Sequence, residues 1–215
     1  MTNEFTAVRK EYERGRLLEV NAPTDPLVMF NEWMAEAVAA NIREPNAMTV
    51  ATATPDGRPS ARVILLKGVD ARGFSFFTNY ASRKGEELAA NPWVALCFWW
   101  GVLERQIRIE GKIEKLPAEE SDAYYQSRPF GARVGAHAST QSQVIANRDV
   151  LEARYFELMA HYSEENPPQR PAHWGGYLLR PSLIEFWQGG PHRLHDRLRY
   201  TREDDSEWKI ERLSP

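Results

Sequence analysis

Hydrophobic and polar residues alternate over many short segments of this 215-residue chain. A period of two is typical of a β-strand that buries one face, and Pro, Asp and Gly between such segments are typical of turns. The pattern predicts strands at residues 47–54, 60–69, 74–79, 93–100, 103–116, 174–181, 183–188, 197–202 and 207–213.

Other segments have the features of helices. Pro26 suits the first position of a helix, and Ser82 suits the cap of the helix that follows it. The predicted helices cover residues 26–40, 83–91, 118–128 and 147–162. Because the strands follow one another and the helices are inserted without regular alternation, we predict an α+β fold with an antiparallel sheet or barrel. No G-x-G-x-x-G motif follows a strand, which disfavours a dinucleotide-binding fold.

Composition narrows the class of protein. The net charge of −3 disfavours a nucleic-acid-binding protein, which needs an excess of positive charge. The longest apolar stretch, residues 93–103, is far shorter than the roughly 20 residues that span a bilayer. The single cysteine, Cys97, cannot form an intrachain disulfide, which fits a reducing compartment. We expect a cytoplasmic protein that binds neither nucleic acid nor membrane.

Residues 187–197, WQGGPHRLHDR, concentrate positive charge in this acidic chain. If the part after the glycines is extended, Arg193, His195 and Arg197 project to one side. Like charges on one face repel, so this arrangement predicts an anion-binding site. His192 and His195 would then lie on opposite faces, and no cysteine or carboxylate cluster accompanies them, so we predict no metal site.

A second basic pair, Arg83 and Lys84, falls in the first turn of a predicted helix. The positive end of the helix dipole disfavours cations there, whereas a bound phosphate would reverse that preference. The alternative is a solvated basic patch.

Further donors fall into three groups. Arg62 and Lys67 bracket an apolar run, and they reach one ligand only if the strand bends or ends between them. Tyr124 and Arg128 lie one helical turn apart, where they could hold one anion or simply pack at a helix surface. The third group comprises side chains suited to hydrogen bonding along the edge of a heterocycle or to ordinary surface positions, namely Gln106, Gln141 and Ser142.

These groups donate hydrogen bonds, and none is an obvious catalytic base. The sequence also lacks a G-x-S-x-G motif and a Cys/His pairing in motif context, so covalent nucleophilic catalysis is disfavoured. Such an inventory suits a phosphorylated planar cofactor that performs the chemistry itself.

The segments RVILLK, FFTNYASRK, LERQIRIEG, YYQSRP, TQSQ and WQGGPHRLHDR, in this order and spacing, closely resemble the pyridoxine/pyridoxamine 5′-phosphate oxidase family. The resemblance runs from about Asn21 to the C-terminus. It implies an FMN-binding split β-barrel with additional helices over residues 21–215, preceded by a mobile N-terminal segment at 1–20. It also implies a homodimer with FMN at the subunit interface, and oxidation of pyridoxamine 5′-phosphate or pyridoxine 5′-phosphate by O₂ to pyridoxal 5′-phosphate and hydrogen peroxide.

By matching residues, the resemblance assigns both ligand sites. The FMN site comprises Arg62, Val63, Ile64, Leu65, Leu66, Lys67, Phe77, Thr78, Arg83, Lys84, Gln106, Gln141, Ser142, Trp187 and Arg197. The substrate site comprises Arg9, Tyr12, Lys67, Tyr124, Arg128, Arg193 and His195. The implied reaction is hydride transfer from substrate C4′ to flavin N5. Arg193 and His195 are the implied catalytic residues, because they position the pyridine ring and bond its substituents.

Two residues depart from the family pattern. Ala132 stands where the family usually has a serine that contacts the substrate phosphate, and His137 replaces a usual tryptophan. Loss of a hydroxyl donor to a phosphate costs roughly 1.5–3 kcal/mol unless water replaces it. Two alternatives are a split-barrel flavin reductase with another substrate and a non-catalytic carrier of pyridoxal phosphate. The RLH and YYQSR segments, which serve the vitamer in the family, favour the oxidase.

Overall fold

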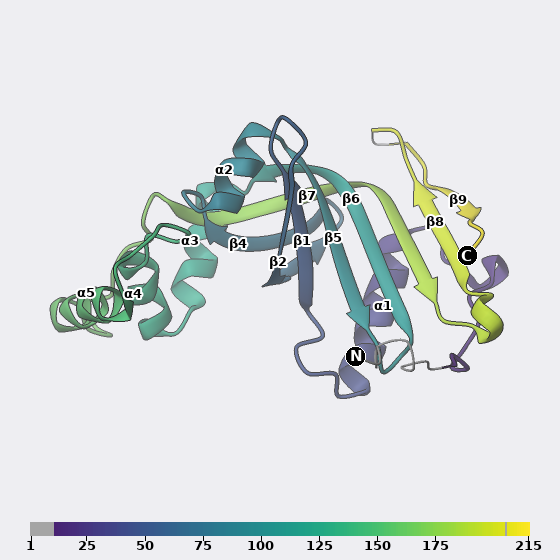
Figure 1. Ribbon diagram of the computed structural model, residues 1–215, viewed down its shortest axis with the longest axis horizontal. Helices are drawn as coiled ribbons and strands as arrows, with labels where there is room; N and C mark the ends of the chain where they lie inside the picture. The colour runs from purple at the N-terminus through teal and green to yellow at the C-terminus, as the bar shows by residue number, and fades with distance from the viewer. Residues whose placement is uncertain (1–10, 205) are drawn as a thin grey trace, which may run out of the picture.

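One curled antiparallel sheet forms the body of the molecule (Figure 1). The computed structural model describes residues 11–204 and 206–215. The strand order is β2-β1-β5-β6-β7-β4-β3, with β8 paired to β7 and β9 paired to β8. The strands are β1 (Ala47–Ala53), β2 (Pro59–Leu65), β3 (Gly68–Asp70), β4 (Gly73–Asn79), β5 (Trp93–Trp100), β6 (Arg105–Lys115), β7 (Trp174–Gln188), β8 (Asp196–Thr201) and β9 (Lys209–Arg212). The predicted α+β class with an antiparallel sheet is confirmed.

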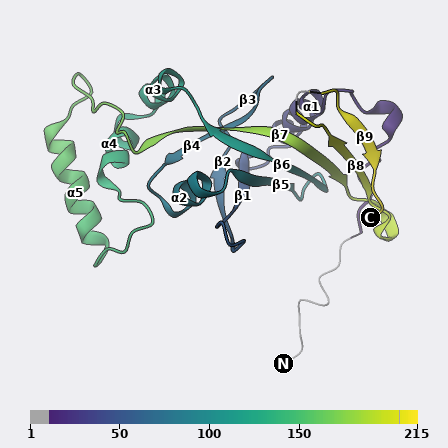
Figure 2. The same ribbon diagram turned by 90° about the horizontal axis from the view of Figure 1, so that it is seen from above.

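The α-helices lie on both sides and at one end of this sheet (Figures 1 and 2). They are α1 (Pro26–Ala39), α2 (Arg83–Ala90), α3 (Ala118–Ser127), α4 (Phe130–Ala138) and α5 (Arg148–His161), with short 3-10 turns η2 (Glu19–Asn21) and η3 (Pro191–Arg193). Both predicted helix starts are confirmed. Pro26 occupies the first turn of α1, and the Ser82 side chain accepts the backbone N–H of Gly85 in α2.

Strand β7 is a single strand of 15 residues, where the sequence pattern predicted two strands, 174–181 and 183–188. β7 pairs with β6 from Tyr177 to Gln188, whereas its other edge pairs with β4 up to Leu179 and with β8 only from Leu183. Pro181 lies in this gap and opposite Gly111, where the β6 register shifts. A missing N–H costs little at such an irregularity, so the strand continues and joins the two ends of the molecule.

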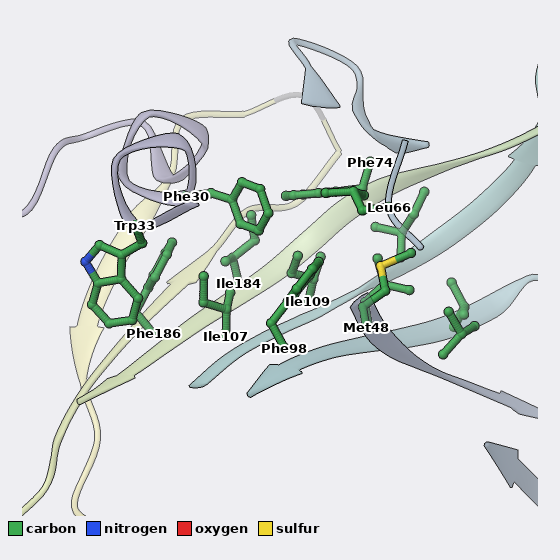
Figure 3. Close-up of a cluster of buried hydrophobic side chains, with 14 of the residues drawn as sticks. Phe30, Trp33, Met48, Leu66, Phe74, Phe98, Ile107, Ile109, Ile184 and Phe186 are labelled. Atoms are coloured by element: carbon green, nitrogen blue, oxygen red, sulfur yellow. The ribbon is translucent and has the colours of Figure 1, made fainter. Parts of the chain in front are cut away.

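The main core lies between α1 and one face of the sheet (Figure 3). Phe30 of α1 packs edge-on against Phe74 and Phe98, with ring centroids 4.9 and 5.4 Å away. Trp33, one turn later, packs against Phe186 at 5.2 Å. The alternation in the sequence produced this core, because every second residue of β5 from Val94 to Trp100 is buried.

Helix α4 was not predicted from the sequence. It follows Pro129 and consists largely of small residues, so it has little hydrophobic periodicity. α5 lies beside it and carries no buried residue, and Phe156 of α5 remains 65% exposed. The two helices extend from one end of the sheet (Figure 2), and the exposed Phe156 leaves apolar surface uncovered there.

Candidate functional site

A cavity of about 550 Å³ opens at the end of the sheet that carries α3 and α4. Its walls come from the end of β2, β4, α2, α3, α4 and the start of β7. Nine residues of the sequence-based site prediction line it, namely Ile64, Leu65, Lys67, Phe77, Thr78, Lys84, Tyr124, Arg128 and Gln141. Residues far apart in the chain thus converge on one hollow.

Small residues of α4 and its C-cap leave room for this cavity. Ala132, Gly135, Ala136 and Ser139 follow the spacing of one helix face, and all four line the hollow. Because the sequence pattern did not predict α4, it also did not predict this wall of the cavity. Ala132 therefore belongs to the cavity, whereas His137 lies outside its lining and contacts the Gln169 carbonyl oxygen at 2.8 Å through Nε2.

Lys84 is the most buried cation of the cavity, with 8% of the residue exposed. Its Nζ donates to Thr78 Oγ1 at 2.8 Å, to Ser82 Oγ at 3.1 Å and to Gln141 Oε1 at 2.7 Å. All these acceptors are neutral, and burial together with the nearby charge of Arg62 lowers the pKa of Lys84 to about 8. A buried ammonium group with neutral partners is suited to receive an anion.

Beside Lys84, the buried carboxylate of Glu87 organises two arginines. It accepts from Arg83 Nε at 2.8 Å and from Arg62 Nη2 at 3.3 Å, and it also accepts the hydroxyl of Thr52. Burial raises the pKa of the Glu87 carboxyl, but hydrogen bonds from these three partners outweigh it and leave the pKa below its usual value. Sequence reading missed Glu87, although its position four residues after Arg83 on one helix was a signal.

Arg128 also lines the cavity, next to an aromatic stack. Its guanidinium is 4.7 Å from the ring of Trp174, and the Phe77 and Tyr124 rings stack at 3.8 Å. Burial lowers the pKa of Arg128, and its Nη1 is buried with no hydrogen-bond partner. Arg128 is the C-cap of α3 and not part of its last turn, but it still meets Tyr124 in the cavity wall. An unsatisfied buried donor of this kind fits an anionic ligand.

A second cluster lies at the other end of β7. Trp187 is paired in register with Gln106 of β6 and Arg197 of β8. The rings of Trp187 and His195 are 4.7 Å apart, and the Tyr12 ring contacts both at 5.6 and 5.7 Å. The Gly190 N–H donates to His195 Nδ1 at 3.2 Å, so the neutral imidazole carries its proton on Nε2.

The predicted common face of Arg193, His195 and Arg197 is wrong for Arg193. Residues 191–193 form a 3-10 turn, both His192 and Arg193 have positive φ, and β8 begins only at Asp196. Arg193 is exposed in this turn, whereas Arg197 donates to Glu185 Oε1 at 2.8 Å and to the Ser214 carbonyl oxygen at 2.9 Å. The repulsion expected between these arginines is relieved by the turn and by the buried Glu185 carboxylate, which sequence reading missed.

The remaining predicted site residues occupy varied surroundings. The Val63 side chain is 67% exposed, and Leu66 belongs to the hydrophobic core. Ser142 has a φ of 71° in the loop that also carries Gln141. Arg9 lies outside the described residues. Within residues 11–204 and 206–215, no group of three His, Cys, Asp or Glu side chains could hold a metal ion, and no helix is long and apolar enough to cross a membrane.

The two clusters are far apart within one subunit. Trp174 in the cavity wall and Trp187 in the second cluster are thirteen residues apart on β7. At about 3.3 Å per residue, the strand separates them by roughly 40 Å along its path. The views in Figures 1 and 2 agree, because α3 and α4 lie at one end of β7 and β8 at the other.

Comparison with known proteins identifies relatives that span the whole chain. Residues 34–162 match the family described as pyridoxamine 5′-phosphate oxidase, and residues 174–215 match the pyridoxine 5′-phosphate oxidase C-terminal dimerisation region. The pyridoxine/pyridoxamine 5′-phosphate oxidase of Burkholderia vietnamiensis is 60% identical over 97% of both chains. That of a Cyanothece species is 54% identical over the full length of both.

Solved structures agree with this result. PhzG from Burkholderia lata 383, in complex with tetrahydrophenazine-1-carboxylic acid, has a TM-score of 0.86 and 37% identity, covering 93% of this chain and 98% of that one. An FMN-binding protein from Nostoc punctiforme has a TM-score of 0.68 at 21% identity, covering 86% and 97%, and shares the fold. The predicted split β-barrel is thereby confirmed, and the chain belongs to the pyridoxamine 5′-phosphate oxidase family.

Proposed function

We propose that this protein is an FMN-dependent oxidase that converts pyridoxamine 5′-phosphate or pyridoxine 5′-phosphate to pyridoxal 5′-phosphate. The observation that carries the proposal is the presence of two separate anion-binding groups in one cavity. Lys84 lines it with Thr78 and Gln141, Arg128 lines it beside Trp174, and Lys67 is a third cation in its wall. A phosphorylated cofactor and a phosphorylated substrate together would supply the two anions.

The Lys84 side of the cavity fits the phosphate of FMN. Lys84, Arg62 and Arg83 surround the start of α2, where free backbone N–H groups and the helix dipole favour an anion. Glu87 holds the two arginines, so a phosphate would meet preoriented donors. The Arg128 side, with its unpartnered buried Nη1, fits the phosphate of the substrate.

A homodimer would complete each site. The family match over residues 174–215 is to a dimerisation region, and the two clusters of one subunit are too far apart to hold one small substrate. In a twofold dimer, the cavity of one subunit could meet the Trp187–His195 cluster of its partner, and the reverse, which gives two equal sites. The uncovered apolar surface of α5 and the exposed Trp99 also favour burial against a partner.

FMN, if bound, would supply the redox chemistry, a two-electron oxidation of the substrate at C4′ coupled to the reduction of O₂. With pyridoxine phosphate, one O₂ yields the aldehyde and hydrogen peroxide; with the amine, one water is also consumed and ammonia is released. In our proposal the protein positions the reactants. Lys67, Tyr124 and Arg128 of one subunit bind the substrate phosphate. Arg193 and His195 of the other subunit orient the pyridine ring. The Nε2–H of His195 is the donor available for a ring substituent.

The first test is direct. The protein is expected to purify yellow as a dimer with one FMN per subunit, and to release hydrogen peroxide when pyridoxamine phosphate and O₂ are added. Absorbance near the flavin bands, size-exclusion chromatography with light scattering, and a coupled peroxide assay measure these three properties. A colourless protein that takes up no added FMN would end this proposal, and a yellow protein that produces no peroxide would favour a non-catalytic carrier.

A second candidate substrate class comes from PhzG, whose structure contains tetrahydrophenazine-1-carboxylic acid. A tricyclic carboxylate carries one negative charge and no phosphate. Lys67, Tyr124 and the partnerless Nη1 of Arg128 favour a phosphate, which accepts more hydrogen bonds. Competition between the two compounds in the peroxide assay decides: inhibition by the tricycle without its oxidation supports the vitamer, and faster turnover of the tricycle contradicts our assignment.

The affinity for FMN is expected to fall as pH rises above about 8. Lys84 binds phosphate as an ammonium ion, and its pKa in the empty protein is about 8, so FMN binding above this pH requires proton uptake. The dissociation constant should therefore increase by up to about tenfold for each pH unit until the pKa of the bound form is reached. Fluorescence titration of the apoprotein from pH 7 to 10 measures this slope.

Two variants control for other titrating groups. Lys84→Arg stays charged and should remove the slope with FMN still bound, and Lys84→Met should bind FMN weakly at every pH.

The stability of the protein without FMN has the opposite dependence on pH. Because the pKa of Lys84 is lower in the folded state than its ordinary 10.5, the unfolded chain holds more protons between about 8 and 10.5, and the contribution of Lys84 to stability rises with pH. An unchanged slope in Lys84→Arg would contradict this assignment.

A further inference from the structure

The segment that carries Tyr12 has no regular secondary structure, yet Tyr12 lies in a defined place. Its ring meets Trp187 edge-on at 5.6 Å and His195 at 5.7 Å. Gly189 makes this approach possible, because a Cβ atom there would come within 2.7 Å of Tyr12 Cγ. Besides these ring contacts, the peptide groups next to Tyr12 are held by hydrogen bonds.

Glu104 supplies the contacts next to Tyr12. This residue, 3% exposed, lies in the turn between β5 and β6. Its Oε2 accepts the backbone N–H groups of Glu13 at 2.9 Å and Arg14 at 3.1 Å. Its own carbonyl oxygen accepts the N–H of Gly189 at 2.7 Å. One buried residue thus joins the Tyr12 segment to the end of β7, where Trp187 lies.

A second group holds the same segment farther along. Asp196 Oδ2 accepts the Leu17 N–H at 3.0 Å, and the Leu17 carbonyl oxygen accepts from Arg212 Nη2 at 2.7 Å. Arg212 also pairs with Asp196 and with Glu19, at 2.5 Å in each case. These contacts fix residues 17–19 against β8 and β9. Because they lie five or more residues from Tyr12, they limit its range, whereas Glu104 acts on the adjoining peptide groups.

We propose that Glu104 is a positioning residue that holds Tyr12 against His195 and thereby builds one wall of the substrate site. The part of this inference that concerns turnover rests on the proposed oxidase function. A buried carboxylate that accepts two backbone N–H groups orders the chain more strongly than a neutral acceptor. Glu104 itself acts on the site through Tyr12 and not through contact with the substrate.

The first experiment reads the position of Tyr12 without substrate or turnover. The Hε1 proton of His195, assigned by comparison with His195→Asn, senses the neighbouring aromatic rings in the NMR spectrum of the purified holoprotein. Glu104→Ala and Tyr12→Ala should move this resonance in the same direction, and Glu104→Gln, which keeps one acceptor oxygen, should move it less. Glu36→Ala is the matched control, since Glu36 pairs with Arg105, the residue after Glu104. It should leave the resonance in place.

The second experiment measures coupling in catalysis. Glu104→Ala should raise KM for pyridoxamine phosphate about tenfold with the FMN dissociation constant unchanged, and Tyr12→Ala should do the same. The double variant should be no worse than the worse single variant, because Glu104 has nothing to position once the ring is absent. Additive losses would overturn the proposal, as would an unmoved His195 resonance in Glu104→Ala.

Two outcomes need separate treatment. If Glu104→Ala fails to fold, as judged by thermal unfolding, Glu104→Gln takes its place, because it keeps the size of the side chain and removes the charge that holds the two N–H groups. It should still shift the His195 resonance and raise KM, by less than the loss of the Tyr12 ring does, and a wild-type spectrum with a wild-type KM would overturn the proposal. If the wild-type protein oxidises no vitamer, the oxidase proposal fails, but the NMR result still decides whether Glu104 positions Tyr12.

Discussion

Subunits that carry Arg128→Leu, when mixed with subunits that carry Arg193→Leu, are expected to regain about a quarter of the wild-type oxidase activity. Each variant alone should be nearly inactive, because every site in its dimer lacks one substrate contact. In a random mixture, half of the dimers contain one subunit of each kind. Such a dimer has one doubly altered site and one intact site, so half of the dimers regain one site of two.

The structure gives the reason for this expectation. Arg128 lies in the cavity at the start of β7, and Arg193 lies in the turn that follows its end. The strand places the two ends roughly 40 Å apart along its path, so in our proposal they meet in one site across the dimer. The variants are mixed, dissociated in mild denaturant, refolded together with FMN, and assayed for peroxide.

Mixing Arg128→Leu with Lys67→Met provides the control. Both residues line the same cavity, so every site in the mixed dimer keeps one altered residue and activity should stay low. Recovery in this control as well would mean that refolding and not sharing of sites restores activity. No recovery in the first mixture, with mixed dimers shown by mass spectrometry, would place the whole site within one subunit.

Arg193→Leu is expected to lower turnover about 100-fold or more with FMN still bound, because loss of a positioning contact acts on the reacting geometry. Arg197→Leu is expected to raise the FMN dissociation constant about tenfold or more, the usual cost of losing a charge-assisted hydrogen bond. Saturating FMN should then restore part of the activity of Arg197→Leu, and His195→Ala should resemble Arg193→Leu. Fluorescence titration of FMN, followed by the peroxide assay at saturating FMN, measures both effects.

The two arginines have the same chemistry but different surroundings. Arg193 is exposed in a 3-10 turn, whereas Arg197 is half-buried and bonded to Glu185. Arg199→Leu is a matched control on the same strand, since the guanidinium of Arg199 pairs with Glu211 of β9. It should retain both FMN and turnover. Equal loss of FMN in Arg193→Leu and Arg197→Leu would refute this division of roles.

Local physics allowed the sequence alone to determine much of the fold. Alternation fixed which face of β5 is buried, Pro26 and Ser82 marked the starts of α1 and α2, and helices inserted between hairpins indicated an antiparallel α+β protein. Each of these signals depends on residues close together in the chain. The basic pair at the start of α2 was an equally local signal, and Lys84 of this pair lines the cavity.

The tertiary structure decided the features that depend on distant residues. β7 continues through Pro181 because its partner on the edge opposite to β6 changes there from β4 to β8, and α4, which consists of small residues, packs beside α5. The burial of Lys84 depends on Gln141, which lies 57 residues farther along the chain. The distance between the cavity and the Trp187 cluster comes from the length of one strand. Pairing of strands, burial of charge and the separation of two clusters are long-range properties, so local patterns in the sequence carried little information about them.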